Sequence, residues 1–148
     1  MKEIIKQVIR ESQEILYPPL FQREIKIPLK SNKIISIIGP RRSGKTYLLY
    51  LLIKDLKNKG ISNERIIYIN FDDPRLLPFN SKGLELILES YRELYPNHRN
   101  KKNYIFFDEI QNVKDWEIGI RRIYDTNKFH VFVTGSSSKL LSREIATH

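Results

Sequence analysis

The sequence contains no cysteine, and its 148 residues include one alanine and one methionine. Without cysteine the chain can form no disulfide, no thiolate metal site and no cysteine nucleophile. No run approaches the roughly 18 consecutive apolar residues that a membrane span needs. The N-terminus alternates charged residues with isoleucine, which is not typical of a secretory signal. These absences favour a cytoplasmic protein whose length suits one domain.

Acidic residues are also few relative to basic ones. The chain has 26 Lys and Arg against 17 Asp and Glu, so its formal net charge is 26 − 17 = +9. This excess favours an anionic partner, which could be a nucleotide, a nucleic acid or both. The histidines His98, His130 and His148 share no ligand spacing, so the sequence predicts no zinc site.

Residues 39–46 read G-P-R-R-S-G-K-T, which matches the phosphate-binding loop G-x-x-x-x-G-K-[ST]. The loop follows the apolar run 34–38 and precedes a helix-compatible stretch, as the motif requires. Gly39 and Gly44 allow backbone conformations that turn successive N–H groups inward around a phosphate. The N-terminus of the following helix adds its positive dipole end.

We predict that this loop binds the phosphates of a nucleotide together with Mg²⁺. Lys45 would reach the β- and γ-phosphates, and the Thr46 hydroxyl would bind Mg²⁺. The two arginines of the loop are either solvated or contact a neighbouring protomer or nucleic acid. The predicted nucleotide-binding residues are Gly39, Pro40, Arg41, Arg42, Ser43, Gly44, Lys45, Thr46 and Tyr47.

The chain repeats a strand–helix rhythm. Strands are predicted at 34–38, 65–71, 103–108 and 129–134. Helices are predicted at 44–59, 82–95, 116–126 (with Asp115 as N-cap) and from about Ser138. Because these strands are continuous apolar runs, we expect a mainly parallel sheet with helices on both faces, a three-layer α/β P-loop fold.

Two further elements are predicted before this core. Residues 1–20 would form an amphipathic helix (2–16) and a linker, and the core would occupy 21–148. The alternation at 25–29 predicts a short strand, which Pro28 would confine to a sheet edge.

A pair of carboxylates, Asp108 and Glu109, follows the apolar strand residues 104–107. In open α/β sheets ligands bind at this carboxyl edge of the strands. Asp108 is therefore predicted to hold the Mg²⁺ shell, and Glu109 to act as the general base that polarises water. Gln111 either orients Glu109 or is a surface residue without a role in the site.

Two weaker features keep alternative interpretations. Asp72 and Asp73 either form a turn before Pro74 or support the outer shell of the metal. The basic segment 97–102 precedes a core strand, so we place it at the edge opposite the phosphates. It is either a solvated loop or a contact for nucleic acid.

The combination of motifs resembles one family. The phosphate loop occurs with F-D-D-P-R at 71–75, F-F-D-E-I-Q at 106–111, Trp116, and T-G-S-S-S-K-L-L-S-R-E-I at 134–145. It is similar to AAA-superfamily ATPases of archaea and bacteria that carry a Pro-Arg-Arg loop and an Asp-Glu-Ile-Gln box, from about residue 20 onward.

The resemblance implies Mg²⁺-dependent ATP binding at 39–46, with Asp108 and Glu109 handling Mg²⁺ and water. It also implies a fourth strand between the first and third, ending in a polar γ-phosphate sensor. Thr134 is the first candidate for this sensor and Ser136 the second; as an alternative, these hydroxyls cap the next helix.

The C-terminus departs from the family pattern. Family members continue past the R-E-I segment with a Gly-Arg pair, a further strand and a C-terminal domain, often likened to nucleic-acid-binding or nuclease-like folds. We therefore expect the core to lack its last strand and C-terminal domain, and hydrolysis without an arginine finger to be slow. The open edge at 34–38 would pair with 25–29 or another chain, or aggregate.

The leading functional hypothesis is an ATPase domain, a motor or switch that acts on nucleic acid or on an attached effector domain. Further copies of the chain are an alternative partner. A second hypothesis is a nucleotide-binding switch or scaffold with negligible turnover. A small-molecule kinase would need a lid, and the sequence offers no candidate between residues 48 and 103.

Overall fold

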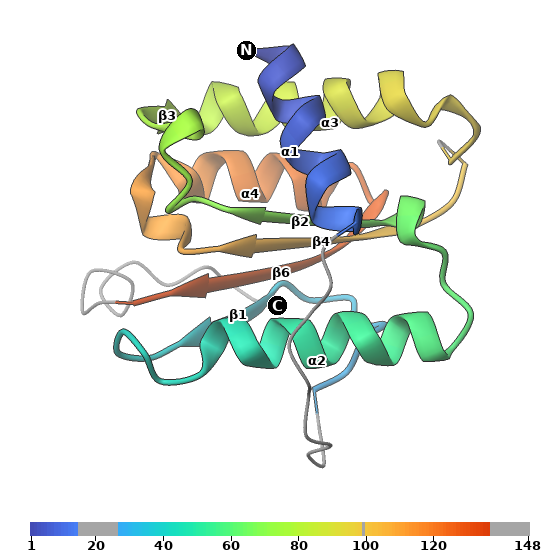
Figure 1. Ribbon diagram of the computed structural model, residues 1–148, viewed down its shortest axis with the longest axis horizontal. Helices are drawn as coiled ribbons and strands as arrows, with labels where there is room; N and C mark the ends of the chain where they lie inside the picture. The colour runs from blue at the N-terminus through green and yellow to red at the C-terminus, as the bar shows by residue number, and fades with distance from the viewer. Residues whose placement is uncertain (15–26, 99, 137–148) are drawn as a thin grey trace.

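The computed structural model describes residues 1–14, 27–98 and 100–136 (Figure 1). Its helices are α1 (Lys2–Glu14), α2 (Lys45–Asn58), α3 (Ser81–Leu94) and α4 (Trp116–Asp125). Its strands are β1 (Ile35–Ile38), β2 (Ile66–Asn70), β3 (Phe79–Asn80), β4 (Asn103–Asp108), β5 (Val113–Lys114) and β6 (Phe129–Gly135). Among the described helices, none has the length and apolarity that crossing a membrane requires.

Four parallel strands form the main sheet in the order β1-β6-β4-β2. The fourth core strand, β6, thus lies between the first and the third, as predicted. The carboxyl ends of the strands share one edge of the sheet, because all four run in the same direction. Asp108 ends β4, and its neighbour in β6 is Thr134, since Phe107 pairs with Val133.

The sheet is the middle of three layers, which confirms the predicted α/β fold class (Figure 1). Helix α2 covers one face, and α1, α3 and α4 cover the other. Successive side chains of a strand point to opposite faces. The residues that pack toward α2 include Tyr68, Tyr104, Phe106 and Phe132. Those packed toward the other helices include Ile67, Ile69, Ile105, Phe107, Val131 and Val133.

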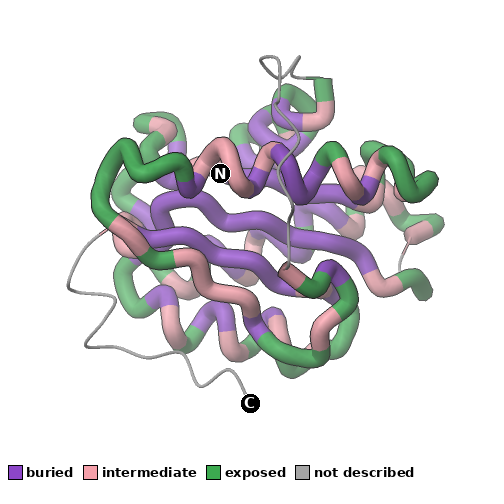
Figure 2. The backbone as a smooth tube through the Cα atoms, turned by 90° about the horizontal axis from the view of Figure 1, so that it is seen from below, coloured by how far each residue is buried: buried purple, intermediate pink, exposed green. Residues whose placement is uncertain are grey.

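Strands β2, β4 and β6 are buried on both faces, as Figure 2 shows for the central strands of the sheet. This double burial explains why they read as continuous apolar runs in the sequence. Helices α3 and α4 approach closely at Gly119, where an added Cβ would lie 2.4 Å from Leu84 Cδ1. A larger residue at this position would push the two helices apart.

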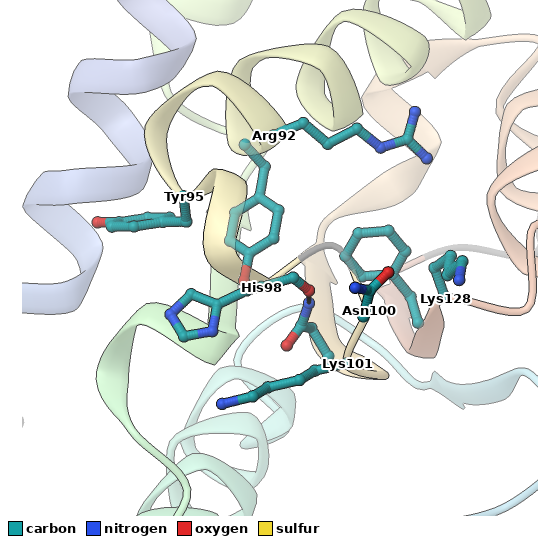
Figure 3. A pocket seen from close by; sticks show the side chains of 9 residues that line it. Arg92, Tyr95, His98, Asn100, Lys101 and Lys128 are labelled. Atoms are coloured by element: carbon teal, nitrogen blue, oxygen red, sulfur yellow. Dashed lines mark hydrogen bonds between the residues drawn. The ribbon is translucent and has the colours of Figure 1, made fainter.

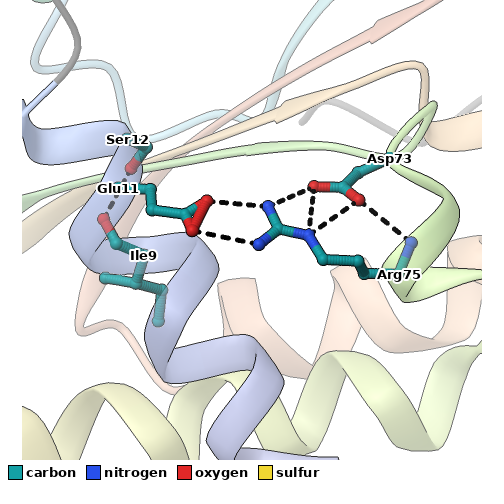
Figure 4. Close-up of polar contacts among 5 residues, drawn as sticks. All are labelled: Ile9, Glu11, Ser12, Asp73 and Arg75. Atoms are coloured by element: carbon teal, nitrogen blue, oxygen red, sulfur yellow. Dashed lines mark hydrogen bonds and ion pairs between the residues drawn. The ribbon is translucent and has the colours of Figure 1, made fainter.

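Helix α1 is packed onto the three-layer core through its apolar face. Ile5 and Ile9 are fully buried against α3 and β2, and Val8 is nearly so. At its C-terminal half, Glu11 accepts two hydrogen bonds from Arg75, and Arg75 also pairs with Asp73 (Figure 4). Asp73 additionally accepts from the backbone N–H of Arg75 (3.0 Å), which caps the short 3-10 helix Pro74–Leu76. The backbone N–H of Asp73 donates to the Asn70 carbonyl (3.1 Å) and closes the turn expected before Pro74.

In the described residues one prediction is wrong and another is confirmed only for the position of the residue. The strand expected at 25–29 is absent over 27–29, because Ile27 and Leu29 pack against the α2-side core instead of pairing with β1. Asp115 occupies the N-cap position of α4, but its φ of 56° lies in the left-handed region and its side chain makes no capping bond.

Other elements were not predicted or fall outside the described residues. The two-residue strands β3 and β5 form a small parallel sheet, which the periodicity of the sequence did not predict. The linker expected after α1 and the helix expected from Ser138 lie largely or wholly outside the described residues.

Candidate nucleotide-binding site

The phosphate-binding loop connects the end of β1 to the start of α2. The N–H of Gly39 donates to the carbonyl of Gly135 (3.2 Å), which fixes the loop to the end of β6. Gly44 is the N-cap of α2 with φ 90°, a backbone region that favours glycine. Arg42 also has a positive φ, 61°. The loop thus leads directly into a helix N-terminus, whose free N–H groups and dipole favour an anion.

Lys45 is buried, with 7% of its surface exposed, and its ammonium group turns back over the loop. Its Nζ donates to the carbonyl oxygens of Gly39 (2.9 Å) and Pro40 (2.6 Å) and lies 3.5 Å from the Ser43 hydroxyl. These carbonyls hold the amine at the loop. A phosphate oxygen entering the loop offers the same amine a charged acceptor in their place.

Asp108 is the centre of a hydroxyl network at the carboxyl edge of the sheet. It is fully buried, and its Oδ2 accepts hydrogen bonds from Thr46 (2.7 Å) and Tyr68 (2.6 Å). Thr134 donates to Oδ1 and accepts from the backbone N–H of Glu109 (3.0 Å). The three hydroxyls come from α2, β2 and β6, so the network joins the phosphate loop to three neighbouring strands.

Tyr68 is a member of this network that the sequence analysis missed. Burial, reinforced by the carboxylate of Asp108, strongly raises the pKa of its phenol. The Tyr68 hydroxyl therefore remains a proton donor at any ordinary pH. In the sequence, Tyr68 is a ring with a polar tip within a predicted strand. That its side chain faces the same side of the sheet as Asp108 follows only from the register of β2 against β4.

Glu109 follows β4 in a left-handed conformation (φ 59°, ψ 51°) that turns its side chain away from that of Asp108. Its Oε2 accepts from Gln111 Nε2 (2.8 Å) and from the Ser136 hydroxyl (2.8 Å). Gln111 and Ser136 also bond each other, which closes a three-membered ring of hydrogen bonds. Within the part of the chain that the structure describes, Oε1 makes no hydrogen bond.

A hollow of about 450 Å³ opens between the loop and the carboxylates of Asp72 and Glu109. It is lined by Arg41, Arg42, Gly44, Lys45, Thr46, Asp72 and Glu109. Three cationic side chains and two carboxylates thus face one space, which suits a polyphosphate with a divalent cation. Asn112 also contributes to this region, since it donates to the Phe71 carbonyl (3.0 Å) and to Asp72 (2.9 Å).

The other site residues predicted from the sequence lie at different positions around this hollow. Thr134 is fully buried on Asp108 and lies behind the hollow. Ser136 is half-buried and bonded to Glu109. Tyr47 is partly buried one residue beyond Thr46, and Pro40 and Ser43 are exposed on the loop.

The donor set fits Mg²⁺. This ion prefers oxygen ligands and is held by one or two carboxylates together with substrate phosphates. The Thr46 hydroxyl and the Asp108 carboxylate supply such oxygens 2.7 Å apart. Among the described residues no group of three or more His, Cys, Asp or Glu side chains could hold a metal by itself.

Comparison with known proteins places the chain among relatives. A family model described as an AAA domain matches residues 31–148. The chain belongs to this AAA domain family. It is therefore a nucleotide-binding, ATPase-like P-loop domain, and the resemblance drawn from its motifs is confirmed at the level of the superfamily.

Proteins similar to this AAA domain occur in archaea and bacteria. The chain is 43% identical over 147 residues to the uncharacterized protein MJ1544 of Methanocaldococcus jannaschii, covering 99% of this chain and 31% of the relative. It is 33% identical over 122 residues to an uncharacterized protein of Haemophilus influenzae, covering 82% and 30%. The chain thus spans about a third of the length of these curated relatives. A solved structure, of Caenorhabditis elegans PCH-2, matches with a TM-score of 0.49 and 17% identity over 96% of this chain and 37% of that one.

Proposed function

We propose that this AAA domain binds ATP with Mg²⁺ at the hollow beside Lys45 and hydrolyses it slowly. The supporting observation is the bond between Thr46 and Asp108, which brings the end of the phosphate loop and the end of β4 together at 2.7 Å. Glu109 lines the same hollow. The hollow is therefore lined by the phosphate-binding loop, by Thr46 with the buried Asp108 bonded directly behind it, and by the carboxylate of Glu109, which bonds neither of them.

The residues divide the work by their positions. The loop amides and Lys45 hold the phosphates, and Arg41 and Arg42 add positive charge at the rim of the hollow. Thr46 and Asp108 would hold Mg²⁺, which when bound would neutralise charge on the phosphates. Glu109, through its Oε1, would take a proton from the attacking water.

Thr134 and Ser136 then act as positioning residues in this proposal. Thr134 fixes Asp108 and the backbone of Glu109 at the same time. Ser136 and Gln111 fix the carboxylate of Glu109. We propose that both residues sense the γ-phosphate indirectly. The phosphate would act on Asp108 and Glu109, and these two residues are bonded to Thr134 and Ser136.

Two substitutions test the proposal. Lys45→Ala should weaken ATP binding by about 10- to 100-fold, because a hydrogen bond to a charged group contributes about 1.5–3 kcal/mol. Lys54→Ala, which changes an exposed lysine of the same helix, is the matched control and should bind like the parent. Glu109→Gln should keep ATP binding and lower phosphate release by roughly 10²-fold or more. ATP binding by Lys45→Ala with parental affinity would refute the site.

The alternative is a nucleotide-dependent switch with negligible turnover. The closed ring of Glu109, Gln111 and Ser136 favours it, because the carboxylate is already engaged. Steady-state phosphate release by Gln111→Ala distinguishes the slow ATPase from the switch. A lower rate indicates that Gln111 orients a working base, whereas a higher rate indicates that it restrains the base. In either case we propose that closure around ATP acts on nucleic acid, another copy or an attached effector domain.

A further inference from the structure

A second hollow, of about 270 Å³, lies at the opposite edge of the sheet from the phosphate loop (Figure 3). It is located where β4 and β6 begin, next to the C-terminal end of α3. Its lining residues are Tyr91, Arg92, Tyr95, His98, Asn100, Lys101, Asn103, Lys128 and Phe129. None of these nine is acidic, so the hollow is unsuited to a cation and suited to an anion.

Cations reach this hollow from three separate parts of the chain. Arg92 extends from α3, Lys101 precedes β4 and Lys128 precedes β6 (Figure 3). Lys101 and Lys128 are exposed, so neither charge is consumed by burial. At the same edge, burial and the neighbouring Lys102 lower the pKa of His130, which is consistent with a positive local potential.

The inner wall of the hollow is aromatic and rigid. Tyr91 and Phe129 are buried and meet edge to face, with ring centroids 6.0 Å apart. The Tyr91 hydroxyl donates to the Glu64 carbonyl (2.7 Å), and the buried Tyr91 and Phe129 rings form the floor of the hollow. Tyr95 and His98 line it with partly exposed rings, whose centroids are 6.1 Å apart. The side-chain amide of Asn103 donates to the His98 carbonyl (3.1 Å), which ties His98 to the start of β4. The binding surface is therefore largely preformed.

We propose that this hollow binds single-stranded nucleic acid, with one base against the partly exposed rings of Tyr95 and His98 and the flanking phosphates on Arg92, Lys101 and Lys128. Aromatic surface combined with cations along a groove is the chemistry that single strands recognise. At about 270 Å³ the hollow is just below the range of roughly 300–1,000 Å³ for small-molecule pockets, so it suits one base of a longer strand. Bases of a duplex are stacked and paired and could not enter.

The inference does not depend on ATP hydrolysis, because the hollow shares no residue with the nucleotide-binding site. Its test is fluorescence anisotropy with labelled 20-mers: (dT)20, (rU)20, a 20-base-pair duplex and an abasic strand of the same charge. The parent should bind a single strand at least tenfold more tightly than the duplex and the abasic strand. Whichever of (dT)20 and (rU)20 binds more tightly identifies the natural chemistry as DNA or RNA.

A charge-reversal pair locates the site. Lys101→Glu with Lys128→Glu should weaken single-strand binding at least tenfold and reduce the slope of log K against log salt by about 1.4, at about 0.7 per phosphate contact. The matched control is Lys82→Glu with Lys114→Glu, two exposed lysines outside this hollow with the same change in net charge. The control should bind nearly as the parent does, and both pairs should melt as the parent does.

Several results would overturn the proposal. Equal losses in the two charge-reversal pairs would show that net charge alone attracts the strand. Equal affinity for the abasic strand would remove the base from the hollow, and equal affinity for the duplex would remove the requirement for a single strand. Tighter binding of poly-glutamate than of either oligonucleotide would identify an acidic polypeptide as the partner instead.

Discussion

At the scale of single residues, Asp108 shows how one carboxylate links a binding loop to a sheet. It accepts hydrogen bonds from Thr46, Tyr68 and Thr134 while it is fully buried. A buried carboxylate needs such donors, because an unpaired buried charge is strongly unfavourable. Displacement of Thr46 by a metal ion would leave Tyr68 and Thr134 in place, so the carboxylate would remain oriented.

The Tyr68 hydroxyl is therefore expected to stabilise the fold more than an ordinary buried phenol. Tyr68→Phe keeps the ring and removes a bond to a carboxylate, worth about 1.5–3 kcal/mol. Tyr91→Phe is the matched control, since its hydroxyl bonds the neutral Glu64 carbonyl and should cost about 0.5–1.5 kcal/mol. Urea unfolding measures both. A smaller loss for Tyr68→Phe than for Tyr91→Phe would contradict this role.

At the scale of elements, helix α1 is held by apolar burial within the core and by ion pairs at its surface. Lys2 and Lys6 both bond Glu93 of α3, at 2.9 and 2.8 Å. The Lys6 and Lys2 ammonium groups lower the pKa of Glu93 from 4.5 to about 2. The pairs are exposed, so their contribution is small and is screened by salt.

Acid should loosen this attachment in a defined window. Because the pKa of Glu93 is lower in the folded state, the pairs stabilise the fold above about pH 4.5 and lose this effect as the pH falls toward 2. The difference in unfolding free energy between the parent and Glu93→Gln should thus be largest near neutral pH and shrink by about pH 3. High salt should shrink it too. A difference independent of both pH and salt would show that Glu93 acts through packing alone.

The same scale shows what the sequence could and could not predict. Apolar runs bounded by turns located β2, β4 and β6, because double burial requires such runs. The alternation of apolar and polar residues at 25–29 wrongly predicted a strand, since Ile27 and Leu29 reach the core from a segment that is not a strand over 27–29. The phosphate loop and the acidic pair were found as local motifs, whereas Tyr68 belongs to the site only through the pairing of β2 with β4.

At the scale of the whole molecule, the fold separates two anion-binding surfaces by the length of the parallel strands. The phosphate loop and Asp108 lie at the carboxyl edge of the sheet, and the basic hollow that contains Lys101 and Lys128 lies at the amino edge. Strands β4 and β6 contribute to both edges, with Phe129 at one end of β6 and Thr134 near the other. Strands β4 and β6 therefore connect the two edges directly.

Ligand binding at the carboxyl edge should be measurable as global stabilisation, since the site joins the phosphate loop, β2, β4 and β6. At an ATP–Mg²⁺ concentration 100-fold above Kd, a ligand that binds only the folded state adds about 2.7 kcal/mol. For a domain of this size that shifts Tm upward by roughly 5–10 °C in a thermal melt. EDTA should reduce the shift, because Thr46 and Asp108 then lack the ion that connects them to the phosphates.

The control for this shift is Lys45→Ala, whose melting temperature should change little with ATP, while Lys54→Ala should follow the parent. An equal shift in Lys45→Ala would mean that ATP stabilises the chain from elsewhere, with the basic hollow as the first place to look. Lys101→Glu with Lys128→Glu would then abolish the shift. If instead that pair keeps the full shift and Lys45→Ala loses it, the two edges bind different ligands, as their different linings require.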